Sequence, residues 1–210
     1  MKTENAPYLI GITGGSASGK THFLNSLKNL FGADEVCIIS QDNYYKRAYH
    51  HQKDENGHIN FDLPECIDLH LFATDIAKLK KGRSVEIEEY LFQHTDVQPQ
   101  KLVFKPAKII VCEGLFIFYQ QEILEQFDLK IFINADEEIA FNRRLKRDVA
   151  ERNIDEDFVL YQWKNHVIPS YRKYLLPFMA QADLIVNNNV HFEQSLKVVS
   201  DHLRSVLNQH

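Results

Sequence analysis

The segment Gly14-Gly-Ser-Ala-Ser-Gly-Lys-Thr21 constrains this chain more than any other. It fits the pattern G-x-x-x-x-G-K-[ST], in which a glycine-rich loop turns its backbone N–H groups toward the phosphates of a nucleotide. We expect Lys20 to reach the β- and γ-phosphates and the Thr21 hydroxyl to hold Mg²⁺. The residues predicted to bind the nucleotide here are Gly14, Gly15, Ser16, Ala17, Ser18, Gly19, Lys20 and Thr21.

The sequence on both sides of this loop favours a phosphate-binding role. Residues 8–13 are apolar and predict a short buried strand. Residues 21–30 place Phe23, Leu24 and Leu27 on one face of a predicted helix, whose positive dipole end would face the phosphates. Strand, loop and helix in this order are the context that the motif needs. The alternative is a glycine-rich turn that binds nothing.

Strands alternate with helices along most of the chain, and this order predicts a doubly wound, mostly parallel α/β sheet. Further strands are predicted at residues 36–40, 108–114, 129–133 and 182–186. Further helices are predicted at residues 68–81, 120–127, 136–152, 157–167 and 191–207. We expect the helical segment at 157–167 to break before Pro169. The whole chain, residues 1–210, is predicted to form a single domain of the P-loop NTPase class.

Two stretches depart from this alternation. Residues 85–90 and 101–104 predict an antiparallel hairpin, inserted at about residues 84–105. A lone histidine on such a hairpin, here His94, is more often structural than functional. Residues 46–60 are polar and rich in histidine, but their spacing matches no zinc pattern, so we expect a solvated, mobile loop.

Charge and cysteine content narrow the class of protein. A net charge of −5 argues against a dedicated nucleic-acid binder. No apolar run approaches the roughly 20 residues of a membrane span, and no secretory apolar region follows the N-terminus. The three cysteines form no C-x-x-C pair, which favours buried free thiols in a reducing compartment. We therefore expect a cytoplasmic protein with a small-molecule partner, not nucleic acid or membrane, and leave a homo-oligomer open.

Three acidic residues stand where ligands bind in open α/β sheets. Asp42 lies just past the strand at 36–40 and is a candidate general base or an indirect Mg²⁺ ligand through water, unless it only caps a turn. Glu113 closes a strongly apolar strand, at the place where P-loop proteins carry a second acid that helps to hold the metal. Asp62 precedes Leu-Pro and could point into a cleft, although a turn acid is the simpler interpretation.

The helix predicted at 136–152 carries a group of arginines, namely Arg143, Arg144, Arg147 and Arg152. Guanidinium groups match phosphoryl oxygens in pairs, so this helix and the residues to about 157 could form a lid over the nucleotide. The alternative is a solvated helix with internal salt bridges, because Asp148 lies four residues from both Arg144 and Arg152.

Together these segments resemble the uridine–cytidine kinase family, the phosphoribulokinase/uridine kinase-like P-loop small-molecule kinases. The resemblance rests on the glycine-rich loop and on residues 41–45, 61–64, 112–114 and 143–152, and it runs nearly end to end. It implies that ATP with Mg²⁺ is the phosphate donor. It also implies functional residues, by group: Asp42, Lys20 and Arg147 in catalysis; Arg143 and Arg147 at the nucleotide; Thr21, Glu113 and Asp42 at the metal; and Asp62, Tyr90, His94, Arg144, Arg152 and Gln162 at the acceptor.

The chain departs from the family pattern on the acceptor side. The hairpin of the family carries a Tyr-Asp pair before its histidine and a basic residue two positions after it. Here Glu89 and Tyr90 stand at the positions of the Tyr-Asp pair, and Asp96 stands at the position of the basic residue. Ile154 replaces a second lid arginine. The resemblance implies ATP-dependent phosphorylation of the 5′-hydroxyl of a pyrimidine nucleoside.

Three alternatives remain open at this point. The acceptor could be another small alcohol, such as a sugar phosphate, pantothenate, glycerate or nicotinamide riboside. The chain could be a nucleotide-dependent switch, although it lacks an N-K-x-D motif. It could also be a degenerate nucleotide-binding protein without activity.

Overall fold

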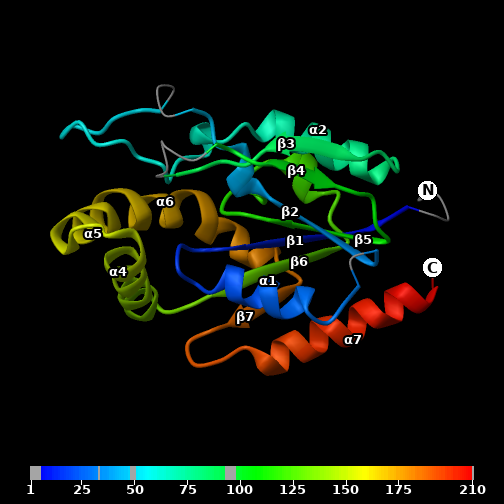
Figure 1. Cartoon of the computed structure of the whole chain (residues 1–210). Coiled ribbons are helices and arrows are strands. Elements are labelled where there is room, and N and C mark those ends of the chain that lie inside the picture. The colour runs from blue at the N-terminus through cyan, green and yellow to red at the C-terminus, as the bar shows by residue number, and fades with distance from the viewer. Residues whose placement is uncertain (1–5, 33, 48–50, 93–97, 210) are drawn as a thin grey trace.

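The computed structural model describes residues 6–32, 34–47, 51–92 and 98–209. A five-stranded sheet with the order β2-β5-β1-β6-β7 forms its centre, and all four pairings are parallel (Figure 1). The strands are β1 (Tyr8–Gly14), β2 (Val36–Ser40), β5 (Ile109–Glu113), β6 (Leu129–Asn134) and β7 (Leu184–Asn187). Each lies within a residue or two of its predicted bounds, so the predicted fold class is confirmed.

Helices cover both faces of the sheet. α1 (Lys20–Lys28) and α7 (Glu193–Gln209) lie on one face, and α2 (Leu69–Lys80) and the short α3 (Gln121–Leu124) lie on the other (Figure 1). Because successive residues of a strand point to opposite faces, β1 contributes Ile10 and Ile12 to one core and Leu9 to the other. This doubly covered arrangement explains why these strands read as continuous apolar runs.

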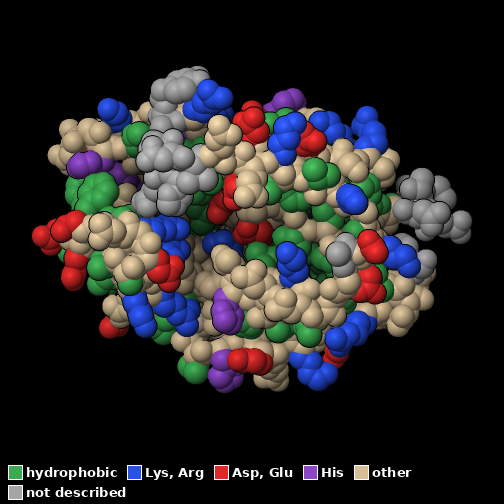
Figure 2. Space-filling view, viewed as in Figure 1, with side chains coloured by type: hydrophobic (Ala, Val, Ile, Leu, Met, Phe, Trp, Pro, Cys, Tyr) green, Lys and Arg blue, Asp and Glu red, His purple; other side chains and the backbone are tan. Residues whose placement is uncertain are grey.

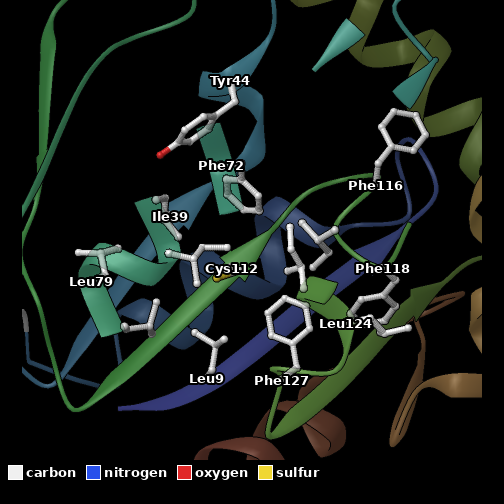
Figure 3. Packing of buried hydrophobic residues seen from close by; sticks show 14 of the residues in the cluster. Leu9, Ile39, Tyr44, Phe72, Leu79, Cys112, Phe116, Phe118, Leu124 and Phe127 are labelled. Carbon is white, nitrogen blue, oxygen red and sulfur yellow. The ribbon is translucent and has the colours of Figure 1, made fainter. Parts of the chain in front are cut away.

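Aromatic rings fill the core on the α2 side. In Figure 3 the Phe127 ring lies between Leu9 and Phe118, and the centroids of the two rings are 5.9 Å apart. Gly11 of β1 makes this packing possible, since a Cβ there would lie 2.7 Å from ring atoms of both Phe118 and Phe127. Any larger residue at this position would push the rings away from the sheet.

The predicted hairpin is present as a separate two-stranded antiparallel sheet. Its strands are β3 (Val85–Glu88) and β4 (Lys101–Phe104), and they do not pair with the central sheet. Val85 is buried against the α2 side of the core. The hairpin loop that carries His94 and Asp96 lies outside the described residues.

The helix α4 (Glu137–Arg152), predicted to form a lid, ends at Asn153, which takes a left-handed conformation with φ +53°, and α5 (Glu156–Gln162) follows. The expected break before Pro169 is wrong, because helical backbone continues through it. A π-helical turn (Trp163–Val167) leads into α6 (Ile168–Ser170), a second π-helical turn (Tyr171–Leu175) and a 3₁₀ turn (Leu176–Gln181). Proline lacks the N–H that an α-helix needs, and the wider π turn before it accommodates this loss.

Candidate active site

The site lies where the central strands end. The carboxyl ends of the strands point toward α4, α5 and α6 (Figure 1), and Figure 2 shows a hollow there with acidic and basic side chains in it. β1 leads into the glycine-rich loop, β2 leads to Asp42, and β5 ends at Glu113. Ser40 and Glu113 are paired across β2 and β5, and the Ser40 hydroxyl donates to Glu113 Oε1. Adjacent parallel strands therefore bring the predicted base and the predicted metal acid together.

Two glycines give the phosphate loop its shape. Gly14 and Gly19 have φ values of +154° and +100°. A Cβ at Gly14 would lie 2.1 Å from the carbonyl oxygen of Ile133, and one at Gly19 would lie 2.1 Å from Asn188 Nδ2. Only glycine fits both the backbone angles and the available space.

Lys20 folds back over the loop. Its ammonium donates to the carbonyl oxygens of Gly14 and Gly15, at 2.8 and 2.9 Å. Burial lowers the pKa of Lys20, and the nearby carboxylates of Glu113 and Asp42 act in the opposite direction. The ammonium thus lies between the phosphate loop and the acids of the sheet edge, where it could meet a phosphate.

Asp42 is not the residue that caps its turn. It lies in a 3₁₀ turn (Gln41–Tyr44), and the Ser40 hydroxyl accepts the Asp42 N–H at 3.2 Å, so Ser40 is the cap. The Asp42 side chain is exposed to solvent. Desolvation by the surrounding protein raises its pKa, while Lys20, Arg152 and Arg147 favour its ionised form. Ser40, and not Asp42, therefore caps the turn, and three positive groups act on the Asp42 carboxyl.

The donor set near Glu113 is suited to Mg²⁺. Burial raises the pKa of Glu113, as does the charge of Asp42, whereas the Ser40 hydrogen bond lowers it. Two carboxylates at one sheet edge and the hydroxyl of Thr21 are hard oxygen donors of the kind that Mg²⁺ takes. Among the described residues no group of three or more His, Cys, Asp and Glu could hold a metal by itself. This fits an ion that takes its remaining ligands from nucleotide phosphates and water.

Gln41, which the sequence motifs do not single out, anchors the turn that carries Asp42. Its side chain has no exposed surface, and its Oε1 accepts the backbone N–H of Phe116 at 2.9 Å. Gly114 makes room for it, because a Cβ there would lie 2.4 Å from Gln41 Cβ. Gln41 therefore ties the turn that carries Asp42 to the segment after β5.

The arginines of α4 converge on one buried acid. Asp148 is the common partner of Arg147, at 2.8 Å, and of Arg144 and Arg152, both at 3.2 Å. The predicted salt bridges are therefore present, but Asp148 and Arg144 are buried and do not lie on a solvated face. Arg144 also donates to Ser16 Oγ at 2.8 Å, so the same cluster touches the phosphate loop. The ion pairs with Asp148 thus hold a positively charged surface over the loop.

Arg143 points elsewhere on the same helix. Its guanidinium donates to the carbonyl oxygens of Asn188 and Asn189, at 2.8 and 3.3 Å, in the loop after β7. Asn188 in turn donates from Nδ2 to the Ser18 carbonyl oxygen at 2.9 Å. Arg143 is therefore connected to the phosphate loop through this loop.

Three of the predicted acceptor residues, Asp62, Arg144 and Gln162, lie close to one another. Arg144 donates to Gln162 Oε1 at 3.3 Å. Burial raises the pKa of Asp62, and Arg144 and His166 oppose that shift. Asp62, in the loop before α2, is therefore close enough to Arg144 of α4 and to His166 after α5 for both to influence its pKa.

An aromatic group lies beside them, of which the sequence analysis named only Tyr90. Its members are Tyr45, His51, Phe61, Tyr90 and Phe92. The ring centroids of Phe92 lie 4.9 Å from Tyr45 and 4.8 Å from Tyr90. Three separate segments supply these rings, so no local pattern reveals the group.

The loop expected at 46–60 is largely exposed in its second half, as predicted, but some of its side chains are bound to distant residues. Asp54 Oδ2 accepts hydrogen bonds from the Tyr161 hydroxyl at 2.6 Å and pairs with His166 Nε2 at 2.7 Å. The His58 ring packs on Phe158 and Tyr161, with centroids 4.9 and 5.2 Å apart. This turn is docked on α5 by partners about one hundred residues away, which the sequence pattern does not reveal.

Residues 9–193 match the sequence profile of the Phosphoribulokinase / Uridine kinase family. The chain belongs to this family. The match covers most of the chain, and the predicted resemblance to a family of kinases is confirmed.

Two relatives show how far the similarity extends. A uridine kinase from Lactobacillus helveticus is 32% identical over 204 residues, which cover 97% of each chain. Uridine-cytidine kinase B from Dictyostelium discoideum is 31% identical over 203 residues, which cover 97% of this chain and 84% of the relative.

Solved structures share the fold at lower identity. Phosphoribulokinase from Rhodobacter spheroides has a TM-score of 0.62 at 17% identity, covering 88% of this chain and 71% of its own. A possible uridine kinase from Bacillus stearothermophilus has a TM-score of 0.58 at 18% identity, covering 88% and 90%. In the described part of the chain, no helix has the length and apolar character needed to cross a membrane.

Proposed function

We propose that the protein transfers the γ-phosphoryl group of ATP to the 5′-hydroxyl of a pyrimidine nucleoside. The observation that carries the proposal is the position of Asp42, which lies within electrostatic reach of Lys20 and of Arg147 and Arg152, two arginines held by Asp148. The acceptor class comes from the relatives, which are named uridine and uridine-cytidine kinases.

The donor half of the site would be the glycine-rich loop and the lid. Backbone N–H groups of the loop and the Lys20 ammonium bind the phosphates, and Arg147 neutralises charge on them. Arg143 is proposed to act through the loop after β7, whose carbonyl oxygens it holds. Thr21, Glu113 and Asp42 would hold Mg²⁺, which neutralises phosphate charge when it is bound.

Asp42 would act on the acceptor. It accepts the proton of the attacking hydroxyl and orients that oxygen toward the γ-phosphoryl group. Lys20, Arg147 and Arg152 are close enough to influence its charge, so positive groups surround the place where phosphoryl charge is transferred. Most of the catalysis would come from this positioning and charge stabilisation, because phosphoryl transfer requires little else from a protein.

The acceptor half would bind the sugar of the nucleoside with one group of residues and the base with another. Asp62 is suited to accept hydrogen bonds from sugar hydroxyls, assisted by Arg144, Arg152 and Gln162. The rings of Tyr45, Phe61, Tyr90 and Phe92 offer apolar faces to a base. His94 remains a prediction for this half, since it lies outside the described residues.

A kinase for another small alcohol is the second candidate. Glu89, Asp96 and Ile154 stand where the family carries other residues, and all three belong to the acceptor side. The donor half is the same in both cases.

A product assay separates these functions. The protein is incubated with ATP and Mg²⁺ against uridine, cytidine, D-glycerate, pantothenate and nicotinamide riboside, and products are identified by mass. We expect nucleoside monophosphate from uridine or cytidine, and product formation slowed by roughly 10²–10⁴-fold when Asp42→Asn replaces the wild type. Product from another acceptor alone would favour the second candidate, and no product from any would leave a nucleotide-binding protein.

A further inference from the structure

One cluster of titratable side chains is not used by the site described above. It consists of Asp54, Tyr161 and His166, three residues from two distant segments of the chain. A single oxygen, Asp54 Oδ2, lies 2.6 Å from the Tyr161 hydroxyl and 2.7 Å from His166 Nε2. Asn56 Nδ2 adds a bond to the Tyr161 hydroxyl at 2.7 Å. Charge-assisted bonds of this length are among the stronger interactions in proteins.

The cluster is built into the fold and is not a chance surface contact. The side chain of His166 is 2% exposed and that of Asp54 is 18% exposed. His166 belongs to the π-helical turn that precedes α6, and π-helical turns are frequent at functional sites because they rotate side chains out of the α-helical register. A buried histidine held by a carboxylate has a fixed position and orientation.

Each of the two segments that form the cluster continues directly to a predicted acceptor residue. On one side, the turn around Asp54 is closed by a bridge between Lys53 and Ile59, and Asn60 Oδ1 then accepts the Asp62 N–H at 2.9 Å. On the other side, Tyr161 precedes Gln162, whose side chain meets Arg144. The segment that carries Asp62 and the helix that carries Gln162 are therefore fastened together at Asp54.

The cluster also lies within electrostatic reach of the acceptor site. His166 and Arg144 are both close enough to the Asp62 carboxyl to oppose the effect of burial on the pKa of Asp62. An ionised carboxylate accepts hydrogen bonds from sugar hydroxyls at both of its oxygens. The bond to Asp54 Oδ2 fixes the His166 ring in this position.

We propose that Asp54, Tyr161 and His166 form a positioning clamp that holds residues 53–62 on α5, so that Asp62 and Gln162 contact the acceptor together. The clamp residues touch neither nucleotide nor acceptor, and they act through Asp62 and Gln162. The inference rests on the proposed function, because it assigns the acceptor site to those two residues.

Steady-state kinetics test the role of the clamp. Asp54→Ala removes the shared oxygens, and Glu55→Ala is the matched control, since it removes an exposed carboxylate from the same turn. We expect Asp54→Ala to raise the KM for the acceptor roughly tenfold, with kcat and the KM for ATP nearly unchanged. His166→Gln should act in the same direction, and Glu55→Ala should behave as wild type. Equal effects of Asp54→Ala and Glu55→Ala, or an equal rise in both KM values, would overturn the clamp.

Hydrogen exchange tests the same clamp without any substrate. Backbone amides of residues 53–62 should exchange faster in Asp54→Ala than in wild type, while those of β1 and β5 stay protected. Unchanged exchange in residues 53–62 would overturn the inference even if the enzyme is active. If the wild type phosphorylates no acceptor, the proposed function fails, and the exchange result still decides whether the clamp exists.

Discussion

The carboxylate of Asp148, which has no exposed surface, lies 2.8 Å from the Nε of Arg147. Arg144 and Arg152 flank the same carboxylate at 3.2 Å. One buried negative charge thus gathers three positive ones on the lid helix. Removing one member of a buried ion group is costly, because the remaining charges lose their partner in a place that water hardly reaches.

Asp148→Asn should destabilise the fold and loosen the lid. We expect the free energy of unfolding to fall by about 3 kcal/mol, the scale for breaking a buried ion pair. The KM for ATP should rise, since the arginines lose the anchor that holds them over the loop. Urea unfolding and steady-state kinetics measure both effects. Glu151→Gln, an exposed acid on the same helix, is the control, and an equal loss in that variant would contradict the prediction.

Asp42→Asn should separate binding from turnover. Because the amide cannot accept the proton of the acceptor hydroxyl, kcat is expected to fall by roughly 10²–10⁴-fold. The affinity for ATP should stay within a few-fold of wild type, as measured by isothermal titration. Near-normal turnover in this variant would remove Asp42 from the role of base.

The activity should depend on pH through Asp42. Desolvation by the surrounding protein raises its pKa, and the base works only when ionised, so kcat/KM should fall on acidification at a pH above about 4, the ordinary value for an aspartate. Arg152 favours the ionised form, so Arg152→Gln should move this acid limb to higher pH. Arg172→Gln, which alters an exposed arginine paired with Glu137, should leave the limb where it is. A pH–rate profile of the three proteins decides the matter.

Gly19→Ala should abolish nucleotide binding. The new Cβ would strain a backbone at φ +100° and displace the side chain of Asn188, which holds the Ser18 carbonyl oxygen. Gly82→Ala is a suitable comparison, since Gly82 has φ +71° but no atom within 4 Å of an added Cβ. That variant should lose only about 1 kcal/mol of stability and bind ATP normally. Equal ATP affinities in a titration of both variants would contradict this account.

The three thiols should resist alkylation in the folded protein. Burial raises the pKa of Cys37 and of Cys66 to about 11, and that of Cys112 also rises. Almost no thiolate is then present at pH 8, and the thiolate is the reactive form. Intact-mass measurement after iodoacetamide treatment should show no label until a denaturant is added. Labelling of the native protein would show that a thiol is accessible.

Local patterns predicted the sheet and the phosphate loop because their signals lie within a few residues of one another. The glycine-rich motif and the apolar strands are of this kind. The bond between Asp54 and His166 joins residues 112 positions apart, and the sequence around neither residue indicates it. The expectation that the helix breaks before Pro169 failed, because a π-helical turn before the proline lets the helical backbone continue.

The separateness of the β3–β4 sheet has a consequence for how such proteins diversify. The hairpin shares the core but no strand pairing with the sheet that carries the phosphate loop. Residues on it can therefore be exchanged without shifting the register of any strand that positions Lys20, Asp42 or Glu113. An ancestor of this architecture could acquire a new acceptor by changes in one small hairpin and keep its phosphate-transfer apparatus intact.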